Sequence, residues 1–139
     1  METSVMTKRT ITLTATGALV AGALTALAAG PAQADGPERH ARGQVAGAAY
    51  DISVEKDRRF EVDADIDGVP AGSTWRMVVR HEGKRVGVRT ARAVRDDGRW
   101  EVDFREVRSK DTSGSDTFKV TLKRVGGPGK VTRTLHFAR

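Results

Sequence analysis

The chain has no cysteine among its 139 residues. This absence excludes disulfides, zinc–thiolate sites, a cysteine nucleophile and a lipid-modified cysteine. A domain outside the cell that has no disulfide must be stabilised by its hydrophobic core. Small secreted protease inhibitors, which usually staple their binding loop with disulfides, are therefore disfavoured.

Asparagine is also absent, and arginine outnumbers lysine 17 to 7, a bias typical of a high-GC bacterial genome. Turns must therefore use Gly, Asp, Ser and Pro. Aromatic residues make up only 5% of the chain. Trp75 and Trp100 both alternate in phase with apolar neighbours, which predicts that they are buried. A carbohydrate-binding module would need such rings exposed in a row.

Only one long uncharged segment occurs, from Ile11 to Gly30. Lys8 and Arg9 precede it, and an Ala-x-Ala site ending at Ala34 follows. This pattern predicts a secretory signal peptide over 1–34 and a secreted, extracellular protein without membrane contact after cleavage. A membrane anchor is the alternative, because the run is about long enough to span, but no basic stop-transfer cluster follows it. The export route, general secretion or twin-arginine, stays open.

Removing residues 1–34 would leave 105 residues, the size of one domain, and would lower the net charge from +6 to +5. Residues 35–48 contain Gly, Ala and charged residues without periodicity, which predicts a flexible lead-in. Residues 49–139 are predicted to form the folded domain.

Apolar and polar residues alternate throughout this predicted domain, and no window of it has a helical period. The clearest case is 60–67, where Phe60, Val62, Ala64 and Ile66 must share one face of a strand. Turn signals such as Asp97-Gly98 separate seven segments of this kind. The predicted strands are 50–55, 60–67, 75–80, 85–89, 100–105, 118–123 and 131–137. They predict an all-β, two-sheet antiparallel sandwich, with a small closed β-barrel as the alternative.

Two features give this pattern a family resemblance. Trp75 lies in the third predicted strand, and the segment 111–120 looks like a corner that leads into the sixth. Through them, residues 49–137 resemble the bacterial immunoglobulin-like and fibronectin type III-like sandwiches. The chain departs from the family in lacking the inter-sheet cysteine pair and in having Phe118 where a corner tyrosine would stand. The resemblance implies a fold but no particular function.

Placing the strands as in an immunoglobulin-like sandwich separates the charges. Strands one, two and five would form one sheet, whose outward residues are Asp51, Glu55, Glu61, Asp63, Asp65, Glu101, Asp103 and Arg105. Strands three, four, six and seven would form the other, whose outward residues include Arg76, Arg80, Arg85, Arg89, Lys119 and Lys123. We expect this basic face to dock an anionic partner, either a cell-wall polymer or an acidic exported protein.

The alternative is that both charged faces only keep the protein soluble. Contact between opposite faces of neighbouring molecules is a further alternative, so the oligomeric state stays open. Nucleic acid is not an expected partner, because the compartment is wrong and no aromatic side chain interleaves the basic positions to stack on bases.

A second candidate site is the segment Asp63-Ala64-Asp65-Ile66-Asp67-Gly68, which matches the opening of a calcium-binding loop. Thr74 stands where the closing bidentate Glu should be. In an extended strand the three carboxylates would also be about 7 Å apart, too far for one ion. We therefore expect no cofactor, with calcium on Asp63, Asp65 and Asp67 as the alternative.

The residues that could perform catalysis lie far apart in the sequence. His40, His81 and His136 have no partner at metal-ligand spacing, and no nucleophile-elbow motif surrounds Ser109, Ser113 or Ser115. We therefore predict that the protein is not an enzyme and has no catalytic residues. The predicted function is a secreted binding or adhesion module. The alternatives are a structural or accessory exported domain without a ligand, or a secreted hydrolase whose site is assembled from loops.

Overall fold

A computed structural model describes residues 36–138 as ten β-strands without a helix. The strands are β1 (Glu38–Val45), β2 (Ala48–Lys56), β3 (Phe60–Asp67), β4 (Thr74–His81), β5 (Lys84–Arg92), β6 (Val94–Asp96), β7 (Arg99–Asp103), β8 (Val107–Ser109), β9 (Asp116–Arg124) and β10 (Lys130–Phe137). The predicted signal peptide, 1–34, lies outside the described residues.

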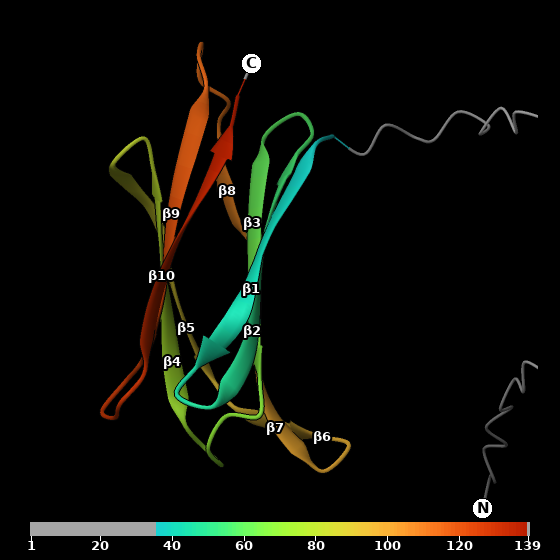
Figure 1. The fold of residues 1–139 in the computed structure, drawn as a ribbon, viewed down its shortest axis with the longest axis vertical. Coiled ribbons are helices and arrows are strands. Elements are labelled where there is room, and N and C mark those ends of the chain that lie inside the picture. The colour runs from blue at the N-terminus through green and yellow to red at the C-terminus, as the bar shows by residue number, and fades with distance from the viewer. Residues whose placement is uncertain (1–35, 139) are drawn as a thin grey trace, which may run out of the picture. The chain divides into compact units, whose positions relative to one another are not determined.

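The strands form two antiparallel sheets, seen as separate layers in Figure 1. One sheet has the order β1-β2-β3-β7-β6, with β8 paired to β3, and the other has the order β10-β9-β4-β5. The predicted all-β sandwich is confirmed, and so is the division of the seven predicted strands between its sheets. The closed-barrel alternative is wrong, because each sheet keeps its own edge strands.

The first strand corrects the prediction of a flexible lead-in over 35–48. β1 pairs with β2 along its whole length, from Glu38↔Glu55 to Val45↔Ala48. Ala46 and Gly47 connect them with φ values of 48° and 81°, as a tight hairpin turn requires. Only every fourth residue of β1 is buried, so its sequence lacks the alternation that marks the other strands.

The core lies between the two sheets. The side chains that enter it are mainly the apolar ones of the alternating pattern along each strand. Phe60, Trp75 and Phe118 are fully buried, and Phe104 and Phe137 nearly so. Trp100 differs from its prediction, because it is only partly buried and packs against the edge of this core. The remaining core consists mainly of Val, Ile, Leu and Ala side chains from both sheets.

A β-bulge alters the face of β5. Val79 pairs with Gly87 but the next residue, Arg80, pairs with Arg85, so the register shifts by one residue. Such a shift moves the following side chains to the other side of the sheet. Arg89 pairs with the buried residue Met77, so its side chain lies on the inner side of the sheet. The prediction that Arg89 belongs to the outer basic face is therefore wrong.

Candidate functional site

The outer side of the four-stranded sheet carries seven cationic residues and no acidic one. We call this surface the basic face: Arg76, Arg80, Arg85, Arg92, Lys119, Lys123 and Lys130. Five of the six residues predicted for it lie there. Arg92 and Lys130 were missed because β5 and β10 each extend beyond the predicted strand.

Six of these cations form two rows across the strands. One row is Arg76, Lys123 and Lys130, and the other is Arg85, Arg80 and Lys119. Neighbouring strands are about 4.8 Å apart, and the rows are four positions apart along β4, which corresponds to about 13 Å. Like charges directly opposite one another destabilise a sheet. The rows therefore cost folding stability.

A neutral row separates the cationic ones. It consists of Val88, Val78, Thr121 and Thr132, and the hydroxyls of Thr121 and Thr132 are 3.0 Å apart. None of the seven cations forms an ion pair with another residue of 36–138. Their charge is therefore not neutralised within the part of the chain that the structure describes.

The outer side of the other sheet is acidic, as predicted. Asp65 lies between Asp51 and Asp103 in the strand register. Partial burial and the carboxylates of Asp51 and Asp103 raise the pKa of Asp65 above its ordinary value. At Asp51 burial acts in the same sense, but hydrogen bonds from His40 and Arg42 outweigh it and lower the pKa.

The candidate calcium residues do not converge. Asp63, Asp65 and Asp67 alternate along the outward side of β3, so their carboxylates stand in a row as an extended strand requires. Asp67 instead pairs with Arg99 at 3.2 Å. Within residues 36–138 the three do not form a group with metal-binding geometry.

A different cluster lies inside the sandwich at the end of β4. His81 Nε2 lies 2.6 Å from Asp116 Oδ1, and His81 Nδ1 lies 2.7 Å from Ser109 Oγ. The ring stacks on Phe118 with 4.2 Å between ring centroids and packs edge-on against Phe60. His81 and Asp116 are both buried, and Ser109 is partly exposed.

Asp116 is held in place by several donors. The backbone N–H and the hydroxyl of Thr112 both donate to Asp116 Oδ1, at 3.3 and 2.7 Å. Burial by itself would raise the pKa of Asp116, but the hydrogen bonds from Thr112 and His81 outweigh it, so the pKa lies below its ordinary value. Asp116 is therefore a carboxylate at neutral pH.

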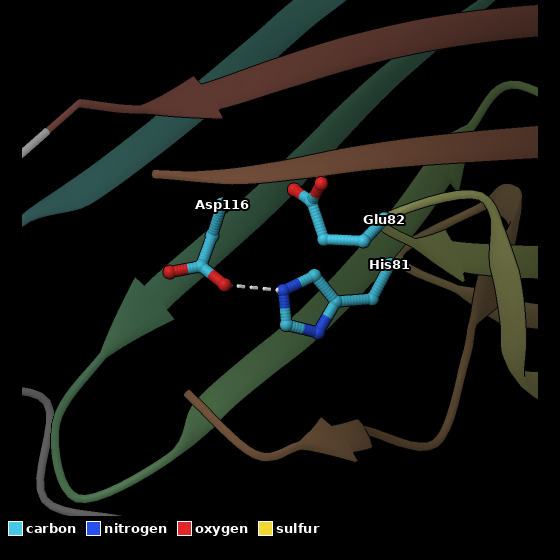
Figure 2. Close-up of side chains that lie close together, drawn as sticks. All are labelled: His81, Glu82 and Asp116. Atoms are coloured by element: carbon cyan, nitrogen blue, oxygen red, sulfur yellow. Dashed lines mark hydrogen bonds and ion pairs between the residues drawn. The ribbon is translucent and has the colours of Figure 1, made fainter. Parts of the chain in front are cut away.

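Figure 2 shows that the Glu82 carboxylate lies beside this pair. His81, Glu82 and Asp116 can each offer one ligand atom, and these atoms all lie within 4.8 Å of one another. One imidazole and two carboxylates are suitable ligands for zinc. However, His81 Nε2 is bonded to Asp116, and a Glu82 oxygen accepts the Thr117 N–H. A bound ion would have to replace these contacts.

Ser109 is one of the residues that line a surface depression of about 580 Å³. Its lining residues are Arg58, Arg59, Arg108, Ser109, Lys110 and Asp111. Arg108 is paired with Glu61 and Glu106, and Asp111 is paired with Lys56. Within residues 36–138, Arg58, Arg59 and Lys110 form no ion pair, so the depression is cationic.

The sequence pattern did not predict this cluster, although the alternation of inward and outward residues contained a signal for part of it. His81 continues the inward series Trp75, Met77 and Val79. Asp116 begins the inward series of β9, the strand that pairs with β4. A buried His and a buried Asp on neighbouring strands could thus have been expected. Ser109 could not, because β8 has only three residues.

No family model matches this chain, and neither a curated protein nor a solved structure matches it. Among residues 36–138, no helix is long and apolar enough to cross a membrane. The fold therefore defines the protein as a β-sandwich of two antiparallel sheets, and any statement of function must come from its surfaces and side chains.

Proposed function

We propose that this chain is a secreted binding module whose basic face docks an anionic polymer outside the cell. The observation that carries the proposal is the two unneutralised cationic rows of the basic face, Arg76–Lys123–Lys130 and Arg85–Arg80–Lys119. Opposed like charges cost stability, and an anionic ligand would recover that cost. Secretion rests on the sequence pattern of residues 1–34.

A linear polymer suits this surface better than a compact ligand. The rows are about 13 Å apart on one side of a sheet. The hydroxyls of the neutral row can donate to phosphate or carboxylate oxygens between them. An extended polyanion could therefore contact both rows at once.

The strand order supports an immunoglobulin-like plan for the sandwich. β2, β3 and β7 lie in one sheet and β10, β9, β4 and β5 in the other, as in the division that the resemblance implies. In that plan the basic face is the outer side of the sheet that contains the core residue Trp75. β1 is an additional edge strand of the other sheet, next to β2.

Charge reversal with a matched control tests the proposal. The double variant Arg76→Glu, Lys119→Glu removes one cation from each row, and Arg95→Glu, Arg105→Glu makes the same change in net charge away from the basic face. Binding to inorganic polyphosphate and to poly-glutamate would be measured by titration calorimetry in low and high salt. We expect the first variant to lose about tenfold or more in affinity and the control to lose much less, with all binding weakening in high salt.

The two polymers separate phosphate from carboxylate recognition. If both variants lose affinity equally, net charge rather than the basic face is responsible and the proposal is wrong. Sedimentation of the wild-type protein alone at low salt is the companion measurement. A concentration-dependent increase in mass that the first variant lacks would show that the basic face instead meets the acidic face of another copy.

A further inference from the structure

Ser109 lies on β8, which pairs with the other sheet, away from the basic face. Ser109, His81 and Asp116 form a continuous chain of hydrogen bonds, of 2.7 Å between Ser109 Oγ and His81 Nδ1 and 2.6 Å between His81 Nε2 and Asp116 Oδ1. A nucleophile bonded to a base, which is in turn bonded to an orienting carboxylate, is the arrangement that serine hydrolases use.

The carboxylate determines which nitrogen of the ring carries the proton. An ionised Asp116 can only accept hydrogen bonds, so His81 Nε2 must donate. In the neutral ring, Nδ1 then has a lone pair directed at Ser109, and the serine hydroxyl donates to it. The roles of the two nitrogens are exchanged relative to the serine protease arrangement, but the chemistry is the same because either nitrogen can act as the base.

The three residues come from different parts of the sandwich. His81 ends β4 and Asp116 begins β9, neighbouring strands of one sheet, whereas Ser109 ends β8, which pairs with the other sheet. Stacking on Phe118 and an edge-on contact with Phe60 hold the ring of His81 in place. Figure 2 shows Asp116 facing the ring edge that carries Nε2. The base is therefore rigidly positioned.

Ser109 differs from its two partners in exposure. Ser109 is partly exposed and lines the cationic depression, whereas His81 and Asp116 are each at most 5% exposed. Arg58, Arg59 and Lys110 line the same depression. Such cations can bind an anionic group of a substrate or stabilise negative charge that develops on a carbonyl oxygen.

We propose that Ser109 is the nucleophile of an esterase whose substrates are acyl esters that carry a carboxylate or phosphate group. Ser109 Oγ attacks the ester carbonyl and its proton moves to His81 Nδ1. The bond to the alcohol then breaks, and the alcohol leaves with that proton, so that an acyl group remains on Ser109. Water attacks this acyl group, gives one proton to His81 Nδ1, and releases the acid, and the proton returns to Ser109 Oγ.

Covalent labelling tests the nucleophile. The purified protein would be treated with a fluorophosphonate, which loses fluoride when a hydroxyl oxygen attacks its phosphorus, and the adduct would be located by mass spectrometry. We expect one adduct, on Ser109, which Ser109→Ala abolishes. Ser113→Ala and Ser115→Ala are matched controls, because these exposed serines lie in the loop that follows Ser109, and both variants should be labelled at the wild-type rate.

A merely structural serine would give a different result. If the wild-type protein takes up no label, or if Ser109 reacts no faster than Ser113, the proposal is overturned, and this outcome does not depend on the folding of any variant. Asp116→Asn adds a second readout. Its amide can donate to His81 and so favour the wrong tautomer, and we expect labelling to be slower by roughly 10²-fold or more. Equal labelling of a folded Asp116→Asn protein would contradict the role of Asp116.

Two nitrophenyl esters test the substrate class. The kcat/KM for 4-nitrophenyl hemisuccinate, which is anionic, should exceed that for neutral 4-nitrophenyl acetate by about tenfold, and Arg58→Gln, Arg59→Gln should narrow this ratio. A ratio near one in the wild-type protein would overturn the anionic substrate class. Because none of these variants lies on the basic face, failure here is distinguishable from failure of polymer binding.

Discussion

Asp116 Oδ1 lies 2.6 Å from His81 Nε2 although 35 residues separate them in the chain. The contact exists because β4 and β9 are neighbours in the four-stranded sheet and both residues face inward. It joins the start of β9 to the end of β4, and His81 also bonds Ser109 at the end of β8. The stability of this corner and the proposed chemistry therefore depend on the same pair.

The pair predicts a specific response to acid. The pKa of Asp116 is lower in the folded protein than in the unfolded chain, so ionised Asp116 stabilises the folded state. This stabilisation is complete above the unfolded pKa, about 3.9, and is lost as the pH falls through the lower folded pKa. Asp116→Asn lacks this titration. We expect the difference in unfolding free energy between wild type and Asp116→Asn, measured with urea from pH 7 to pH 2, to shrink as the pH falls. A constant difference would contradict the assignment, because the other carboxylates are common to both proteins and cancel.

The two tryptophans should differ in their contribution to stability. Trp75 is fully buried, and its Nε1–H donates to Ser73 Oγ at 3.0 Å, so Trp75→Ala should cost about 3 to 5 kcal/mol. Trp100 is only partly buried, and Trp100→Ala should cost clearly less. Urea unfolding of both variants at the same pH checks the order. Acrylamide should likewise quench Trp100 emission much more than Trp75 emission, and equal quenching would contradict the structure.

The fold could be predicted from the sequence because strand alternation is a local signal. Between Phe60 and Asp67 every second residue is apolar and buried, as the alternation predicts. Such alternation, with the turn signals between strands, is enough to predict the strands of a sheet. Arg89 was misplaced because a bulge depends on tertiary packing. At Gly87 an added Cβ would lie 2.5 Å from Val107, so the glycine lets β8 approach β5 closely.

The candidate site was less predictable for a related reason. The signal for His81 and Asp116 lay in their phase, but their contact required knowing that β4 and β9 are neighbours. Ser109 joined them through a three-residue strand that has no periodicity of its own. Sites on β-folds bring together residues that are distant in sequence, and the spacing of Ser109 from the three histidines contained no signal for this contact.

The first strand offers a test of whether residues 38–45 are structured. Ala41 is 8% exposed and faces the core, whereas Gln44 of the same strand is exposed. Ala41→Asp would bury a charge without a partner and should cost about 2 kcal/mol or more, while Gln44→Asp should change stability by less than about 0.5 kcal/mol. Thermal or urea unfolding measures both. If the two variants unfolded alike, β1 would not be docked on the sandwich in solution.

The acidic face predicts that removing one charge stabilises the protein. Partial burial and the charges of Asp51 and Asp103 raise the pKa of Asp65, so the folded protein binds a proton there more readily than the unfolded chain does. The penalty of the charged form is therefore present at neutral pH and disappears as the pH falls below the unfolded pKa. Because Asp65 is only partly buried and solvent screens its charge, we expect Asp65→Asn to add only about 0.5 kcal/mol at pH 7 in low salt.

The gain from Asp65→Asn should vanish near pH 3 and should shrink in 1 M salt, where the Debye length is about 3 Å. Ser53→Ala, on the neighbouring strand, is a control that leaves every charge of this face in place. Urea unfolding of the wild type and each variant at pH 7 and near pH 3, in low and high salt, measures how the stability difference depends on pH and on salt. A stabilisation that persists unchanged at low pH would show that the asparagine acts through packing rather than through the repulsion between Asp65 and its neighbours.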